Sequence, residues 1–383
     1  MTPEQSGVGA VTVTVVVDGR DLQVPAGASV LDACDLAGVY VPRLCAYPGL
    51  EPVGDCGLCF VRIDGAEVRR ACAVEVAPGM RVDTQDEEAR GFRTGSMKAV
   101  LGDHPHVCLV CPQRDGCSRD DCMYGNPPET RCCSEFGRCE IAKVAAYVGA
   151  LAEAPGYQYR ELGATRDHNI RRDLDLCIGC GRCVAACDTL EEAGSALRLV
   201  ETKTLVAAAG DGPGGWAPRS YLGRHVAVPK AADLRSSGCT FCGACVLVCP
   251  TGALTAPGPK GAAWLAKCKE RTTLRSPVLP PEDRLPFTAA EVQAVPTCAG
   301  VFRLFAGTGA VLQISGVMNL RAGLEEALRG SLADEAQTFV FEAEPMYTQR
   351  ESELLAHHLQ EHGSLPRGND VLGDLFDEDD DLF

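Results

Sequence analysis

The first apolar segments of the chain alternate with polar residues, which is the pattern of half-buried strands. Residues 11–17 and 20–24 flank the pair Asp18-Gly19, and Asp-Gly between two alternating segments is a strong signal for a hairpin. Ser29 then precedes a segment with apolar positions at helical spacing, and an acidic residue follows three positions later. This arrangement predicts a capped helix directly after the hairpin.

The pattern continues as a mixture of short strands and amphipathic helices. It predicts strands at residues 60–64 and 68–71, helices at 87–101 and 141–148, and a strand pair at 196–206. A chain of 383 residues has room for two or three domains. The sequence therefore predicts a multidomain α+β fold.

Cysteine content changes this picture. The chain holds 22 cysteines, and residues 1–10 lack the basic start of a secretory signal. Residues 11–17 are too short for a signal core, and no apolar stretch approaches the length of a membrane span. The cysteines are therefore interpreted as metal ligands of a cytoplasmic protein. A net charge of −16 disfavours nucleic acid as a partner.

Two copies of Cys-x2-Cys-x2-Cys-x3-Cys have the spacing of bacterial ferredoxins, in which three cysteines hold one 4Fe–4S cluster and the fourth ligates the neighbouring cluster. This rule assigns one cluster to Cys177, Cys180, Cys183 and Cys249, and a second to Cys239, Cys242, Cys245 and Cys187. A pair of zinc knuckles is the alternative, but zinc sites normally take cysteines in pairs. Two adjacent clusters without a bound substrate predict electron transfer.

A third set of cysteines lies in the glycine-rich loop after the first helix, with the spacing Cys-x10-Cys-x2-Cys-x12-Cys. It consists of Cys45, Cys56, Cys59 and Cys72. With the hairpin, helix and return strand, this loop resembles the β-grasp of 2Fe–2S ferredoxins, although the plant-type spacing is absent. The longer first gap resembles the ferredoxin-like head of the large iron–sulfur subunit of respiratory complex I. That head also occurs in NAD-reducing hydrogenases, iron-only hydrogenases and NAD-linked formate dehydrogenases. A structural zinc site is the alternative.

A histidine precedes the next cysteines, with the spacing His-x3-Cys-x2-Cys-x5-Cys. The set is His104, Cys108, Cys111 and Cys117. It matches the 4Fe–4S site that one histidine and three cysteines hold in the same families. Imidazole in place of thiolate leaves such a cluster less negative and should shift its potential upward. His106 has no counterpart in that motif.

Four further cysteines follow that the motif does not require. They are Cys122, Cys132, Cys133 and Cys139. A fourth 4Fe–4S cluster, a structural zinc and buried unligated thiols are the open interpretations of this set. The predicted cofactors are therefore one 2Fe–2S cluster and three 4Fe–4S clusters, with this additional site undecided.

The last part of the chain has a hairpin pattern leading into a helix, and it resembles the GIY-YIG nuclease fold. The catalytic positions of that fold are altered here. The two signature tyrosines are Phe302 and Gln313, the helix arginine is Gly323, and Glu351 or Glu353 corresponds to the metal-binding carboxylate. Without a phenol to orient water and an arginine to hold phosphate, transition-state stabilisation fails. We interpret the segment as a pseudo-nuclease reused for assembly.

These motifs divide the chain into six parts. They are a 2Fe–2S ferredoxin-like β-grasp (10–85), a histidine-ligated 4Fe–4S domain (86–150), a double 4Fe–4S ferredoxin module (165–255), a proline-rich linker (256–296), a degenerate GIY-YIG-like α/β domain (297–370) and an acidic tail (371–383).

A glycine pattern at 210–215 formally matches a dinucleotide fingerprint. Pro213 interrupts it and no βαβ unit surrounds it, so NAD(P)H is expected to be oxidised on another chain.

The resemblance implies an iron–sulfur electron-transfer subunit of a cytosolic NAD(P)H-linked oxidoreductase complex. Its expected partners are a flavoprotein of the NADH dehydrogenase type and a terminal oxidoreductase subunit, such as a hydrogenase or formate dehydrogenase. The chain itself carries no complete catalytic site. The alternative is an iron–sulfur-regulated GIY-YIG nuclease, which the altered catalytic positions disfavour.

Overall fold

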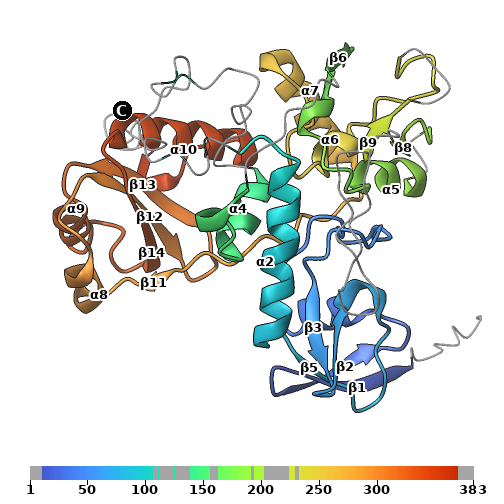
Figure 1. Ribbon diagram of the computed structural model, residues 1–383. Helices are drawn as coiled ribbons and strands as arrows, with labels where there is room; N and C mark the ends of the chain where they lie inside the picture. The colour runs from blue at the N-terminus through green and yellow to red at the C-terminus, as the bar shows by residue number, and fades with distance from the viewer. Residues whose placement is uncertain are drawn as a thin grey trace, which may run out of the picture. The chain divides into compact units, whose positions relative to one another are not determined.

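The computed structural model describes residues 11–106, 108, 111, 122, 125, 139–155, 163–190, 194–201, 224–228 and 233–369. The chain forms two compact units (Figure 1). The first comprises Met1–Val110 and Asn126–Pro280, and the second comprises Cys111–Gly125 and Pro281–Phe383. The glycine pattern at 210–215 and the predicted acidic tail at 371–383 lie outside the described residues.

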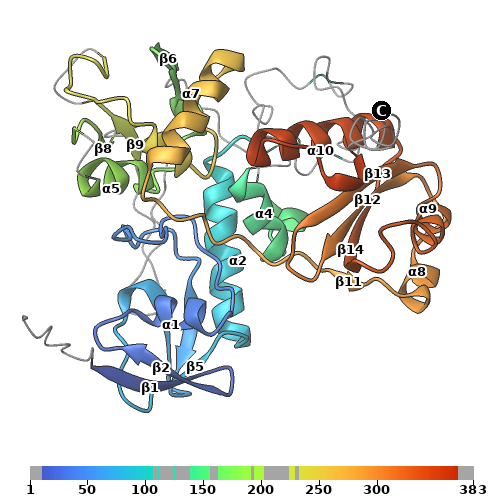
Figure 2. The same ribbon diagram turned by 180° about the vertical axis from the view of Figure 1, so that it is seen from behind.

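The first unit begins with a five-stranded sheet of order β2-β1-β5-β3-β4, with the helix α1 packed against it (Figure 2). Strands β1 and β5 are parallel, and the other neighbours are antiparallel. The elements are β1 (Thr12–Val17), β2 (Arg20–Pro25), α1 (Val30–Leu36), β3 (Phe60–Ile63), β4 (Glu67–Arg70), the 3-10 turn η1 (Ala71–Ala73) and β5 (Arg81–Asp83). The hairpin and helix match the sequence pattern. Cys72, expected on the return strand, lies in η1 because β4 already ends at Arg70.

Local chemistry explains where α1 begins. The Ser29 hydroxyl oxygen accepts a hydrogen bond from the Asp32 backbone N–H at 3.1 Å. The Asp32 carboxylate in return accepts one from the Ser29 N–H at 2.9 Å. This reciprocal capping box satisfies donors that the first helical turn leaves unpaired. The helix buries Val30 and Ala33 in the same core as the sheet residue Val15.

Two helices follow the sheet and pack against each other. They are α2 (Glu87–Gly102) and α4 (Glu140–Tyr147), and the 3-10 turn η3 (Leu151–Glu153) follows them. Asp86 caps α2 by accepting from the Ala89 N–H at 2.9 Å. Met97 of α2 and Ile141 of α4 are fully buried in one core cluster. The two helices therefore share a core with the cysteine loops described below.

The rest of the first unit holds both ferredoxin-type cysteine runs. Its sheets have the orders β10-β7-β6 and β8-β9. The elements are β6 (Ala164–Asp167), β7 (Ile170–Asp173), the 3-10 turn η4 (Leu174–Leu176), α5 (Arg182–Thr189), β8 (Arg198–Glu201), β9 (Arg224–Ala227), α6 (Ala244–Leu247), β10 (Leu254–Thr255) and α7 (Gly258–Arg271). A strand pair was expected within 196–206. In the structure β8 pairs with β9, and residues 202–206 lie outside the described residues.

The second unit is built on a four-stranded sheet of order β11-β14-β12-β13. Its elements are β11 (Leu285–Pro286), α8 (Ala289–Ala294), β12 (Gly300–Ala306), β13 (Val311–Val317), α9 (Leu320–Ala327), β14 (Ala336–Ala343), α10 (Tyr347–His362) and the 3-10 turn η7 (Arg367–Asn369).

The predicted linker at 256–296 is only in part a connector. The helix α7 packs on the ferredoxin-type core through Trp264 and Leu265. At the other end of the segment, β11 pairs with β14 and Val292 is buried in the core of the second unit. The sequence predicts a proline-rich linker with a helix around residues 262–271, and α7 covers that stretch. The apolar positions between the prolines nevertheless find cores to pack in, which composition alone does not reveal.

Candidate iron–sulfur sites

The first group of sulfurs lies between the loop after α1 and the turn η1. Sγ of Cys45 and Sγ of Cys56 are 3.3 Å apart. Cys72 is hydrogen-bonded to both Cys45 and Cys59, so the structure brings all four predicted ligands of this set together. Gly54 adopts a left-handed φ of 78°, which allows the tight turn directly before Cys56.

The electrostatics of this group favour thiolate formation at two of its members. Hydrogen bonds from Cys56 and Cys72 lower the pKa of Cys45, although burial acts in the opposite direction. A hydrogen bond from Cys72 likewise lowers the pKa of Cys59. Thiolates are the form of cysteine that binds metals. In the part of the chain that the structure describes, no three His, Cys, Asp or Glu side chains converge on a single-ion site. The donor set, four buried or half-buried sulfurs from one loop and one turn, fits the chemistry of a small iron–sulfur cluster.

The second group combines the first ferredoxin-type run with one residue of the other run. Cys177, Cys180 and Cys183 are buried, and Cys249 is half-buried. Burial raises the pKa of Cys183, and the negative charges of Cys180, Cys177 and Cys249 raise it further. Cys177, Cys180 and Cys249 therefore lie within electrostatic reach of Cys183, and so does Cys245 of the second run.

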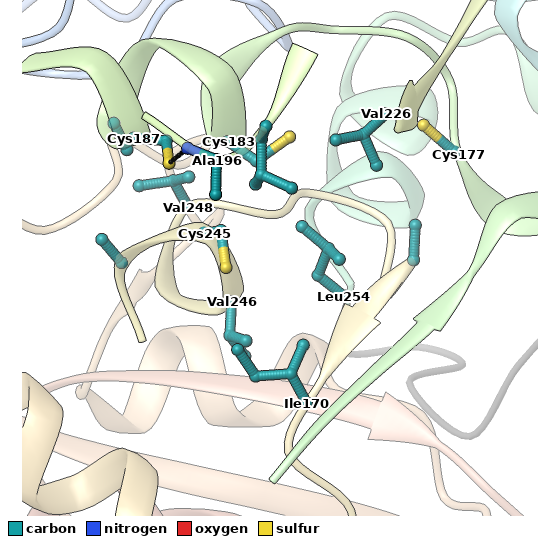
Figure 3. Close-up of a cluster of buried hydrophobic side chains, with 14 of the residues drawn as sticks. Ile170, Cys177, Cys183, Cys187, Ala196, Val226, Cys245, Val246, Val248 and Leu254 are labelled. Carbon is teal, nitrogen blue, oxygen red and sulfur yellow. Dashed lines mark hydrogen bonds between the residues drawn. The ribbon is translucent and has the colours of Figure 1, made fainter. Parts of the chain in front are cut away.

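The third group surrounds a cavity. The residues that line it include Cys187, Cys239, Cys242 and Cys245. The backbone N–H of Ala196 donates to Cys187 Sγ at 3.2 Å (Figure 3). The N–H of Phe241 donates to Cys239 Sγ at 3.4 Å. A cavity lined by the four sulfurs, with N–H donors aimed at two of them, fits an iron–sulfur cluster, whose potential depends on such hydrogen bonds.

The helices of the two runs begin earlier than expected. The fourth cysteine of each run was expected at the start of the following helix. In the first run, α5 contains both Cys183 and Cys187, which are four residues apart on one helical face. In the second run, Cys249 lies two residues beyond the end of α6. Gly181 and Gly243 stand at the N-cap positions with left-handed φ angles of 77° and 80°. The chain turns into each helix before the third cysteine because glycine allows that conformation.

The first and second groups pack directly against each other. Cys45 and Cys56 share one buried hydrophobic cluster with Ile178 and Cys180. A Cβ atom placed on Gly181 would lie 2.2 Å from a methyl carbon of Val53, so the two cysteine loops are in close contact. The second and third groups are also adjacent, since the charge of Cys245 contributes to the raised pKa of Cys183. The spatial order of the groups therefore runs from the first to the second to the third.

Two charged residues beside these groups had no role in the sequence interpretation. Arg182 lies inside the first ferredoxin-type run, and its guanidinium donates two hydrogen bonds of 2.7 Å to the Glu140 carboxylate. Arg182 also lies over the ring of Tyr47, 5.4 Å from the ring centroid. In the sequence, this contact is indicated only by the position of the arginine between two predicted cluster ligands, Cys180 and Cys183. Its partner on α4 is more than forty residues away in the sequence.

The structure tests the histidine-containing set only in part. His104 is buried just beyond α2, and Cys108 and Cys111 are half-buried. His106 is also buried, and its Nδ1 lies 2.9 Å from the His104 carbonyl oxygen. Since a carbonyl only accepts, Nδ1 carries the proton and donates, so His106 helps to hold the backbone of His104. Cys117 lies outside the described residues.

The additional cysteine set is likewise only partly described. Cys122 and Cys139 are half-buried, and Cys139 stands at the N-cap of α4. Cys132 and Cys133 lie outside the described residues. Which interpretation of this set is correct therefore stays a prediction.

Two family models match the chain, and each falls on one of the domains that hold these groups. Residues 10–87 match a 2Fe-2S iron-sulfur cluster binding domain, and residues 176–253 match a 4Fe-4S dicluster domain. The chain is therefore a multidomain α+β protein that contains both kinds of iron–sulfur domain.

Known relatives share this region. The chain is 30% identical over 251 residues to the NADP-reducing hydrogenase subunit HndD of Solidesulfovibrio fructosivorans. The matched region covers 63% of this chain and 35% of the relative. It is 27% identical over 243 residues to the NADPH-Fe(3+) oxidoreductase subunit alpha of Geobacter sulfurreducens, and the match covers 63% of this chain and 24% of the relative. A formate dehydrogenase-type protein of Staphylococcus haemolyticus is 28% identical over 253 residues, and the match covers 65% of this chain and 21% of the relative.

The chain thus spans only about a third or less of the length of these curated relatives. Its iron–sulfur domains are homologous to domains of hydrogenase, formate dehydrogenase-type and NADPH-dependent iron oxidoreductase proteins. Among the described residues, none of the helices has the length and apolar character needed to cross a bilayer.

Proposed function

We propose that this chain is the iron–sulfur electron-transfer subunit of a cytoplasmic NAD(P)H-linked oxidoreductase complex. It relays electrons between a flavoprotein of the NADH dehydrogenase type and a terminal catalytic subunit. The relatives named above support this assignment, since their names include a hydrogenase and an NADPH-dependent oxidoreductase. The terminal subunit is a hydrogenase, a formate dehydrogenase or an enzyme of similar chemistry.

The observation that carries the proposal is the continuous packing of three sulfur groups. Cys45 and Cys56 share a buried cluster with Cys180, and Cys183 shares another with Cys245. Iron–sulfur clusters held there would accept and donate single electrons. The chain's own residues hold the sulfurs, exclude water from between the groups and supply N–H donors.

The proposed cofactors are one 2Fe–2S cluster and three 4Fe–4S clusters. Cys45, Cys56, Cys59 and Cys72 would hold the first, and the ferredoxin-type runs would hold two others in the combinations given above. His104, Cys108, Cys111 and Cys117 would hold the remaining one. The relay then runs from the 2Fe–2S group to the group around Cys180 and on to the group around Cys245.

The C-terminal domain is proposed to be a degenerate GIY-YIG-like domain that serves assembly. In this domain β12 and β13 form a hairpin, and β14 lies beside β12. The helix α9 follows β13 and precedes β14 in the chain. This arrangement is compatible with that fold. Phe302, at the position of a signature tyrosine, is only 2% exposed and belongs to the core. A Cβ on Gly323 would already lie 3.2 Å from the Phe302 ring, so an arginine there has little room. These contacts suit packing rather than phosphate chemistry.

The test is metal analysis of the anaerobically purified full-length chain and its variants. The proposed sites predict about 14 irons per chain (2+4+4+4), or about 18 if the set around Cys122 holds another 4Fe–4S cluster. Cys245→Ala should remove the iron of one 4Fe–4S cluster. Cys298→Ala is the matched control, because Cys298 is exposed in the second unit and belongs to none of the proposed sites.

Reconstitution with a flavoprotein subunit completes the test. The loaded chain should become reducible by NADH or NADPH only when that subunit is present. Iron near six per chain, with zinc in the cysteine sites, would contradict the relay.

A further inference from the structure

Arg182 is a buried cation placed between two of the proposed iron–sulfur sites. Its side chain is 2% exposed, and it pairs with Glu140 at 2.7 Å. The Glu140 carboxylate accepts two hydrogen bonds from the guanidinium, and an arginine side chain keeps its proton in proteins. Removing one partner of such a pair would leave an uncompensated charge in the interior. The pair therefore brings one positive and one negative charge into the protein at defined positions.

The surroundings of the guanidinium include thiols of both neighbouring sites. Cys180 is two residues away in the chain, and the guanidinium lies over the ring of Tyr47, two residues after Cys45. Cys45 and Cys180 also share one buried cluster. Its Nε is buried and has no hydrogen-bond partner among the described residues. A buried N–H without a partner is costly, and cluster sulfur is an acceptor that would satisfy it.

We propose that Arg182 sets the reduction potentials of the two iron–sulfur sites on either side of it, with Glu140 as the opposing charge. This inference rests on the proposed function, because it requires clusters at the Cys45 and Cys180 groups. Reduction adds negative charge to a cluster. A fixed cation nearby therefore favours the reduced form and raises the potential, whereas a fixed carboxylate lowers it. The effect should be larger at the Cys180 site than at the Cys45 site.

The experiment is a potentiometric titration of the full-length, cluster-loaded chain, followed by EPR, which separates 2Fe–2S from 4Fe–4S signals. Arg182→Met should shift the reduction equilibrium of the Cys180 site about tenfold toward the oxidised form, equivalent to 59 mV for one electron. A smaller shift of the same sign is expected at the Cys45 site. Arg182→Lys should shift the Cys180 site in the same direction but by less than Arg182→Met, because it keeps the charge and loses the Nε donor. Glu140→Gln should shift both sites the opposite way.

The opposite signs separate an electrostatic role from a structural one. Arg182→Met and Glu140→Gln break the same ion pair, so a general disturbance of the fold would move the potentials in the same direction in both variants. Arg62→Met is the matched control, since Arg62 also pairs with a carboxylate, that of Asp86 at 2.7 Å. It should leave both potentials unchanged.

Shifts of the same sign in both variants, or shifts below about twofold in the equilibrium, would overturn the inference. A shift in Arg62→Met as large as that in Arg182→Met would overturn it as well. If Arg182→Met does not load its clusters, the upward shift in Glu140→Gln and the smaller downward shift in Arg182→Lys carry the test. Absence of clusters from the Cys45 and Cys180 groups of the wild type would instead refute the proposed function.

Discussion

The close contact between Gly181 and Val53 can be tested by substitution. Gly181→Ala adds a methyl group at a left-handed position, which costs about 1–2 kcal/mol for an L-residue. The new Cβ would also lie 2.2 Å from Val53 Cγ2 and 3.2 Å from a Leu199 methyl carbon. Forcing extra atoms into occupied space typically costs a further ~1–3 kcal/mol, and the lower end applies here because Val53 is 37% exposed. Val53 cannot easily turn away, because a β-branched side chain is stiff at χ1.

Gly65→Ala provides the matched control. Gly65 has a similar φ of 69°, but nothing lies within 4 Å of a Cβ built there. It should therefore carry only the backbone cost. The difference between the two variants, at the lower end of roughly 1–3 kcal/mol, measures the packing of the 2Fe–2S loop on the ferredoxin-type loop.

The assay is the apparent unfolding midpoint of the cluster-loaded chain at a fixed heating rate, read from the cluster absorbance. For a unit of this size, 1 kcal/mol corresponds to about 2–4 °C. Adding Val53→Ala to Gly181→Ala should recover most of the excess loss, because it removes the methyl groups that clash. Equal midpoints for Gly181→Ala and Gly65→Ala, or no recovery in the double variant, would refute the contact between the two loops.

Three further predictions concern other parts of the chain. Truncation after Pro259 should lower iron content more than truncation after Pro280, because only the first removes α7 and the packing of Trp264; iron analysis of both forms decides this. His104→Cys should lower the reduction potential of its cluster, because a thiolate adds negative charge. His106→Ala should broaden the EPR signal of the same cluster, because it removes the hydrogen bond to the His104 carbonyl oxygen. The isolated loaded chain should show no NADH binding by calorimetry, and tight binding would contradict the assignment of NAD(P)H oxidation to a partner subunit.

Short-range patterns in the sequence were sufficient for the local elements and for the grouping of most cysteines. The capping box at Ser29 and the Asp18-Gly19 hairpin involve residues a few positions apart, and both appear in the structure as expected. The crossed combination of Cys187 with the second run and Cys249 with the first stays a prediction, because the charge of Cys249 acts on both Cys183 and Cys245. Such features are predictable because one helical turn or one tight loop determines which atoms can meet.

Tertiary structure alone decided which groups are neighbours. The chain order places the histidine-containing set between the 2Fe–2S loop and the ferredoxin-type module, yet Cys45 and Cys180 share one core. The pairing of Arg182 with Glu140 and the packing of α7 on the ferredoxin-type core are also long-range contacts. Periodicity reports which face of a segment is apolar, but not which distant apolar face it will meet. That choice depends on the combined shape and burial of segments more than a hundred residues apart, which no local pattern contains.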